Sequence, residues 1–202
     1  MLKHIMDASR TAKVTKPMRR PIHVELGPIS LAIARRAALR RQEENRAANQ
    51  KDGRVMLDPL KPDIQGAIGE MAAACAFQLP WTGKFKPHAE WITWRTQDGA
   101  DIGDSIEVRA TACSTGSLIL HDSDKDNSPY VLVKLVNDDT EAYIYGWLTA
   151  KEGRKGRVQE DRGHGRPCYY VGVSHLHRLD ILPGLPVGLD MQKLYDNKVV
   201  MP

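Results

Sequence analysis

The chain of 202 residues has few cysteines and no long apolar run. Its three cysteines lie far apart and never form a CxxC pair, which is typical of small apolar residues in a reducing compartment. No eighteen consecutive residues are apolar, so no membrane-spanning helix and no membrane partner are expected. The first 21 residues lack the apolar core of a secretory signal, so export is not expected either. These absences predict a cytoplasmic protein.

What is present is charge, and it is unevenly distributed. Residues 1–54 contain 13 Lys or Arg against 5 Asp or Glu, whereas residues 55–202 contain 16 against 20. The first 57 residues are therefore expected to form a basic arm and helix, and residues 58–202 a single globular domain. Such an arm suits a polyanion, with nucleic acid as the first candidate, and a solubilising tail is the alternative.

Two helices are expected in the first half of the chain. The first covers the stretch from Gly27 to Gly53, with Ser30 as its N-cap. Its apolar stripe is thin, and one face carries four arginines: Arg35, Arg36, Arg40 and Arg41. Either a solvated surface or a phosphate-binding surface explains that face. The second helix begins at Asp63, which follows Pro62 and is its expected N-cap, and it ends before Pro80. It is apolar on most sides, so its Glu70 needs a partner.

From residue 90 the apolar residues alternate with a period of two, which predicts strands. The expected strand segments are 90–96, 100–103, 105–111, 117–121, 130–136, 141–150 and 168–176. Short turn-like separators favour hairpins and an antiparallel middle of the sheet. The polar connection 151–167 either folds over a phosphate backbone through Arg154, Lys155 and Arg157 or is a plain loop. Helices, strands and a short closing helix near 189–197 together predict an α+β fold, or a mixed α/β sheet.

The stretch ADIGDSIEVRAT, residues 100–111, contains the candidate chemistry. A three-residue hairpin loop at 103–105 would make Ile102 face Ile106 and Asp101 face Glu107. Two facing carboxylates are destabilising unless a cation joins them, and Mg²⁺ favours such oxygen ligands. Arg109 falls on the same side of the strand as Glu107. The alternative is a solvated Asp101, with Glu107 paired to an arginine at the surface.

A helix containing GAIGEMA, followed by Asp101, by Glu107-Val108-Arg109 and by further strands, resembles the PD-(D/E)XK, or restriction-endonuclease-like, nuclease superfamily. The resemblance covers about residues 63 to 150. It implies a mixed central sheet of the restriction-endonuclease-like type, flanked by helices, with a basic N-terminal helical extension. It also implies a metal site formed by Glu70, Asp101 and Glu107, with the Val108 carbonyl as a further ligand.

Two positions depart from the pattern of that superfamily. No proline precedes Asp101, and Arg109 stands where the family usually has lysine. Arginine holds its proton too tightly to act as a base, so its expected role is electrostatic stabilisation of a phosphate. Lys134, on a later strand, is the alternative lysine.

The resemblance implies a Mg²⁺-dependent nuclease, with Mn²⁺ as a substitute ion, that hydrolyses DNA phosphodiester bonds. Asp101 and Glu107 would hold the ions, and a homodimer would suit cleavage of both strands. The small size and polar loops fit a protein of a phage or mobile element, in the cytoplasm of a bacterium or an infected host. Two alternatives stay open: a nucleic-acid-binding protein on the same fold without cleavage, and a structural or interaction protein.

Overall fold

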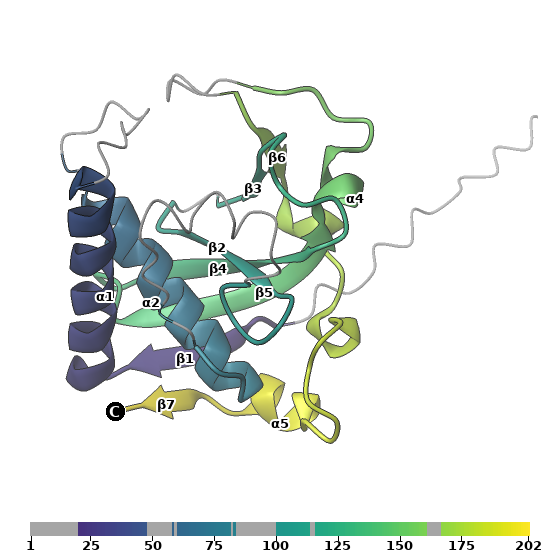
Figure 1. The fold of residues 1–202 in the computed structure, drawn as a ribbon. Coiled ribbons are helices and arrows are strands. Elements are labelled where there is room, and N and C mark those ends of the chain that lie inside the picture. Colours follow the sequence, from purple (N-terminus) through teal and green to yellow (C-terminus); the bar gives the residue numbers. More distant parts are fainter. Residues whose placement is uncertain are drawn as a thin grey trace, which may run out of the picture.

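The computed structural model describes residues 20–47, 58, 60–81, 83, 100–113, 116–160 and 167–202. They form an α+β fold in which a mixed five-stranded sheet is flanked by helices (Figure 1). This confirms the predicted fold class at that level. The strand expected at 90–96 lies outside the described residues.

The order of the strands in the sheet is β2-β4-β5-β1-β7. Their bounds are Ile22–Leu26 for β1, Glu107–Thr111 for β2, Pro129–Val136 for β4, Glu141–Thr149 for β5 and Val199–Met201 for β7. Strand β5 pairs antiparallel with both β4 and β1, as expected for the middle of the sheet. The outer pairs β2–β4 and β1–β7 are parallel. The sheet is therefore mixed, and β2 is one of its two edge strands.

Strand β1 was not among the predicted strands, although its sequence alternates clearly. Ile22, Val24 and Leu26 are buried, while His23 and Glu25 on the opposite face are partly exposed. Because β1 lies between β5 and β7, it shares the main hydrophobic core with the rest of the sheet. One strand of the expected arm over 1–57 thus belongs to the same sheet as strands of the domain expected over 58–202. Residues 1–19 and 48–57 lie outside the described chain.

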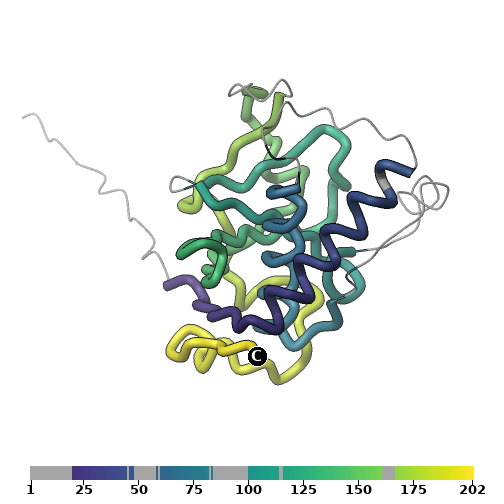
Figure 2. Tube along the Cα trace, turned by 90° about the vertical axis from the view of Figure 1, so that its left-hand side faces the viewer, coloured from purple at the N-terminus to yellow at the C-terminus, as the bar shows by residue number. Residues whose placement is uncertain are grey.

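Helix α1, Pro28–Ala47, begins three residues earlier than an N-cap at Ser30 would place it. Proline suits the first turn of a helix because it has no N–H to satisfy there. Ser30 is therefore not the N-cap. It is buried, and its hydroxyl donates a hydrogen bond to the Pro202 carbonyl (2.5 Å). This bond holds the C-terminus beside the start of α1, as Figure 2 shows.

Helix α2, Leu60–Phe77, packs between α1 and the sheet. Its first backbone N–H groups are capped by Asp58, whose carboxylate accepts bonds from Leu60 N (3.0 Å) and Lys61 N (3.3 Å). The predicted cap, Asp63, lies inside the helix instead. A side chain at Gly69 would have its Cβ 2.6 Å from the Ala110 Cβ on β2. Glycine at this position therefore lets α2 approach the edge strand closely.

A smaller layer covers part of the opposite face of the sheet. A two-stranded ribbon of β3 (Leu118–Leu120) and β6 (Tyr169–Val171) packs with α4 (Ala150–Arg154) over Tyr130, Leu132 and Leu148. Two 3₁₀ turns (Val173–His175 and Leu179–Ile181) and helix α5 (Met191–Asp196) then lead to β7. No helix in the described part of the chain has both the length and the apolar run needed to cross a bilayer.

Candidate functional site

The turn before β2 has the predicted form. Ile102 and Ile106 face each other, with N–O distances of 3.2 and 3.4 Å in the two directions, and both side chains are buried. Gly103 adopts φ +54°, a conformation that glycine reaches without strain. The buried isoleucines fix the turn. Asp101 comes directly before Ile102, and Glu107 comes directly after Ile106. The predicted facing of the two isoleucines is confirmed.

Asp101 and Glu107 form a pair of interacting carboxyl groups at the start of β2. The Asp101 Oδ2 accepts a hydrogen bond from Val108 N–H (2.8 Å), which fixes it to the outer edge of the strand. Burial raises the pKa of Asp101 well above its usual range, and the charges of Glu70 and Glu107 raise it further. The pKa of Glu107 is also raised, because its burial outweighs the opposing effects of Arg109 and of a hydrogen bond with Asp101. Each of the two carboxyl groups is therefore harder to ionise than an ordinary carboxyl group.

Glu70, the buried acid of α2, has its partner in helix α1. Arg41 donates two hydrogen bonds to its carboxylate, at 2.8 Å to Oε1 and 2.5 Å to Oε2, and Trp81 Nε1 donates a third to Oε2 (3.2 Å). Burial by itself lowers the pKa of Arg41, but Glu70 and Asp101 outweigh this effect and the pKa is raised. Arg41 therefore points toward Glu70, whereas Arg35, Arg36 and Arg40 of the same helix are exposed.

Arg109 is held on the side of the strand opposite to α2. Its guanidinium pairs with Asp124 (2.9 Å), lies 4.8 Å from the centre of the Tyr130 ring and approaches the Val108 carbonyl at 3.4 Å. Burial lowers the pKa of Arg109, but the charges of Asp124 and Asp101 outweigh this effect and raise it. Arg109 thus interacts with the charges of the acid pair and binds Asp124, a residue that the sequence analysis did not single out.

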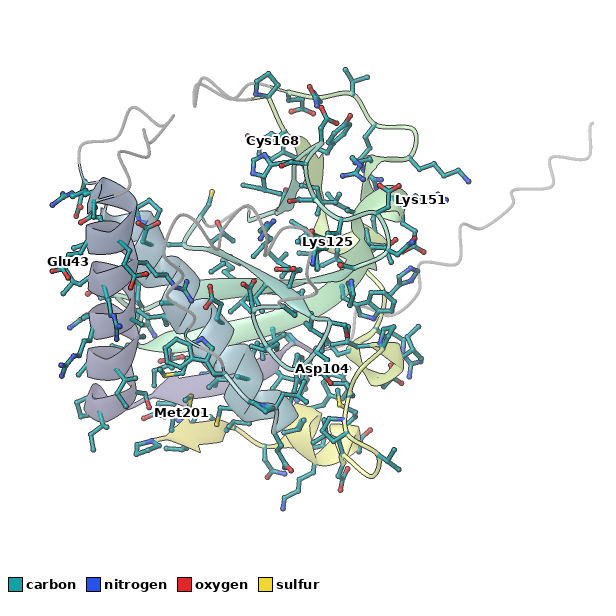
Figure 3. All side chains as sticks on the ribbon, viewed as in Figure 1. Glu43, Asp104, Lys125, Lys151, Cys168 and Met201 are labelled. Carbon is teal, nitrogen blue, oxygen red and sulfur yellow. The ribbon has the colours of Figure 1, made fainter. Side chains whose placement is uncertain are left out.

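Lys125 is a second cation near Glu107 that the sequence analysis did not single out. Its backbone N–H donates to the Tyr130 hydroxyl (3.0 Å), and Tyr130 is the register partner of Glu107 across β2 and β4. The charge of Lys125 favours ionisation of Glu107, so it acts to lower the pKa of that group. Figure 3 shows Lys125 on the loop after β3, and Asp104 on the turn before β2. The other lysine considered, Lys134, is instead in register with Thr111 and Tyr143.

The remaining predicted nucleic-acid contacts fall into two groups. On α1, Arg35, Arg36 and Arg40 are exposed, and Arg40 also approaches Glu44 at 3.4 Å. Around α4, Lys155 is exposed, whereas the two arginines bind carbonyl groups of the protein. Arg154 donates to His121 O (2.7 Å) and pairs with Asp126, and Arg157 donates to Gly153 O (2.9 Å). These two arginines stabilise the α4 region.

The acid pair has the donor chemistry of a hard-cation site. Asp101 and Glu107 bring carboxylate oxygens together, and their raised pKa values mark negative charge that burial leaves poorly compensated. The Val108 carbonyl directly follows Glu107 in the sequence and is approached by Arg109. Over the described ranges, no group of three or more His, Cys, Asp or Glu side chains is arranged to hold a metal ion. These residues therefore suit a site in which the two carboxylates of Asp101 and Glu107 hold the cation. Glu70 lies nearby, but Arg41 and Trp81 bind its carboxylate.

Comparison with known proteins gives no match for this chain among family models, curated proteins or solved structures. The resemblance to restriction-endonuclease-like nucleases thus stays a prediction from the sequence.

Proposed function

We propose that the protein is a Mg²⁺-dependent nuclease that hydrolyses DNA phosphodiester bonds, with Mn²⁺ as a substitute ion, on a fold of the restriction-endonuclease-like type. One observation carries the proposal. Asp101 and Glu107 lie together at the start of the edge strand β2, with their pKa values raised by burial and with Arg109 beside them. Paired carboxylates of this kind attract a divalent cation, and a guanidinium suits a phosphate oxygen.

In this proposal each residue of the site has a separate role. A bound Mg²⁺ would supply Lewis-acid stabilisation of the phosphate and would lower the pKa of water. Asp101 and Glu107 would hold the ion, and the Val108 N–H keeps Asp101 in place on the strand. Arg109, held by Asp124 and Tyr130, would hold positive charge beside the phosphate. The exposed Arg35, Arg36 and Arg40 of α1 and Lys155 would contact the DNA backbone.

The experiment is incubation of the pure protein with plasmid and linear DNA in Mg²⁺ or Mn²⁺. Wild-type protein should cut, and Asp101→Asn and Glu107→Gln should lose cleavage by at least a hundredfold, roughly the effect of removing a main electrostatic contributor. The exposed Asp104, in the same turn, gives the matched control: Asp104→Asn should cut normally. Cleavage by the Asp101→Asn variant at the wild-type rate would contradict the proposal.

A second candidate is a nucleic-acid-binding protein that does not cleave. It is favoured by the engagement of two groups that the resemblance assigns to catalysis: Glu70 is neutralised by Arg41, and Arg109 is paired with Asp124. Binding with a steep salt dependence, in a protein that cuts nothing in either metal, would select this function. Absence of both DNA binding and metal uptake would leave a structural or interaction role.

A further inference from the structure

Arg41, Glu70 and Trp81 connect helix α1 with the turn that contains Asp101. Arg41 and Trp81 both bind the Glu70 carboxylate. Trp81 in turn pairs with Ile102, and Pro80 O accepts a hydrogen bond from Gly103 N (3.1 Å). A single chain of contacts thus runs from α1 through α2 to the residue next to Asp101.

Arg41 and Glu70 carry opposite charges, and both charges would act on a cation at Asp101. Trp81 binds the Glu70 carboxylate and pairs with Ile102, the residue after Asp101, so the ion pair lies beside the site. The negative charge of Glu70 attracts a cation there, and the positive charge of Arg41 repels it. Because the two charges are joined by a bidentate ion pair, their effects on a cation at Asp101 largely cancel. If one of the two charges is removed, the other acts on that cation without compensation.

We propose that Arg41 and Glu70 act as a charge-neutral positioning pair that sets the cation affinity of Asp101 and Glu107, and that Glu70 is not itself a ligand. The inference rests on the proposed cation site. Both oxygens of Glu70 already accept hydrogen bonds, and its side chain is only 8% exposed. Turning Glu70 toward a cation would leave Arg41 without its carboxylate. Arg41 Nε is already buried with no hydrogen-bond partner among the described residues.

The test is calorimetric titration of Mn²⁺ into the full chain without nucleic acid. Glu70→Gln should weaken Mn²⁺ binding, on the order of tenfold, because the positive charge of Arg41 is no longer balanced. Arg41→Gln should tighten binding for the opposite reason. The double variant Arg41→Gln/Glu70→Gln should return to within about threefold of wild type, because the net charge near Asp101 is restored. Arg41→Lys, which keeps the charge, should also stay near wild type.

The controls separate this tuning effect from loss of structure. Glu25 and Lys198 form an exposed ion pair elsewhere, so Glu25→Gln should leave Mn²⁺ affinity unchanged. Circular dichroism checks that each variant is folded. If Arg41→Gln unfolds because Glu70 is left buried without its cation, then Glu70→Gln and the double variant decide the outcome.

Two results would overturn the inference while the cation site survives. Loss of binding in both Glu70→Gln and the double variant would make Glu70 a direct ligand. Unchanged affinity in Glu70→Gln and the double variant would show that the pair does not act on the site. Wild-type protein that takes up no Mn²⁺ would instead overturn the proposed site itself, and this inference with it.

Discussion

At the scale of single residues, the acid pair stores unfavourable electrostatic energy in the folded protein. A carboxyl group whose folded pKa is raised binds its proton more tightly in the folded state than in the unfolded state. The free energy of unfolding therefore falls as the pH rises from the ordinary carboxyl pKa through the raised one. Below that window the penalty is absent, and above it the penalty is complete. Asp101 and Glu107 both contribute in this direction.

Asp101→Asn should therefore stabilise the metal-free protein at neutral pH. Asparagine keeps an oxygen that can accept the Val108 N–H bond but has no charge to repel Glu70 and Glu107. The gain should be roughly 1 kcal/mol, or a few degrees in melting temperature, and should disappear near pH 4. Thermal unfolding followed by circular dichroism at both pH values measures it. A variant less stable than wild type at neutral pH, with Asp104→Asn unchanged, would be inconsistent with a strained acid pair.

Residue-level reasoning from the sequence predicted the turn well and its partners poorly. The facing of Ile102 and Ile106 could be predicted, because a glycine-containing turn between alternating apolar residues allows only one pairing register. Arg41 was missed as the partner of Glu70, because the two are 29 residues apart and on different helices. Its position on the helix gave a signal: Arg41 follows the buried Leu31, Ala34 and Ala38 on the inner side of α1.

At the scale of elements, the close packing of α2 on β2 positions the acid pair. The helix approaches the strand where Gly69 meets Ala110. Glu70, the next residue of the helix, is thereby brought near Asp101. The geometry of the candidate site thus depends on a contact between two small residues.

Gly69→Ala should destabilise the protein by about 1 to 3 kcal/mol, because the added Cβ overpacks the helix–strand contact. The matched control is Gly66→Ala in the same helix, where a Cβ meets nothing within 4 Å. That variant should be more stable than wild type by about 0.5 to 1 kcal/mol, because alanine favours a helix. Urea unfolding of both variants measures the difference. Equal effects of the two substitutions would show that the contact is not tight.

The ends of the elements were predicted less well than the elements themselves. The sequence favours Asp63 as the cap of α2 because it follows a proline, but Asp58 binds the first backbone N–H groups. The sequence favours Ser30 as the cap of α1, but its hydroxyl donates to the carbonyl of the last residue, 172 positions away. Strand β1 was overlooked because it is short and follows a basic stretch, although its alternation was readable. Local capping rules cannot anticipate partners that tertiary packing supplies.

At the scale of the whole molecule, the basic N-terminal third contributes to the core. Strand β1 is bonded on both sides, to β5 and to β7, and α1 packs on α2. Described residues on both sides of the predicted boundary near residue 57 therefore share one sheet and one core. Charge asymmetry along the sequence is evidence about partners and solubility, and does not by itself mark a separate segment.

A truncated chain of residues 58–202 should not fold cooperatively, because it lacks β1 and leaves β5 and β7 without their shared neighbour. A chain of residues 20–202, which retains every described residue, should unfold in one cooperative transition. Differential scanning calorimetry compares the two. A sharp unfolding transition in the 58–202 chain would restore the interpretation of the first 57 residues as an appended arm.

The central claim is that Asp101 and Glu107 together bind a divalent cation. It is tested most directly by calorimetric titration of Mn²⁺ into wild-type protein, Asp101→Asn and Glu107→Gln, over a range of pH. We expect wild-type protein to bind Mn²⁺ with a proton release that grows as the pH is lowered, because raised carboxyl pKa values make protons compete with the metal. Both variants should lose this binding. Mn²⁺ binding that is undiminished in both variants, or none in wild-type protein, would contradict the claim.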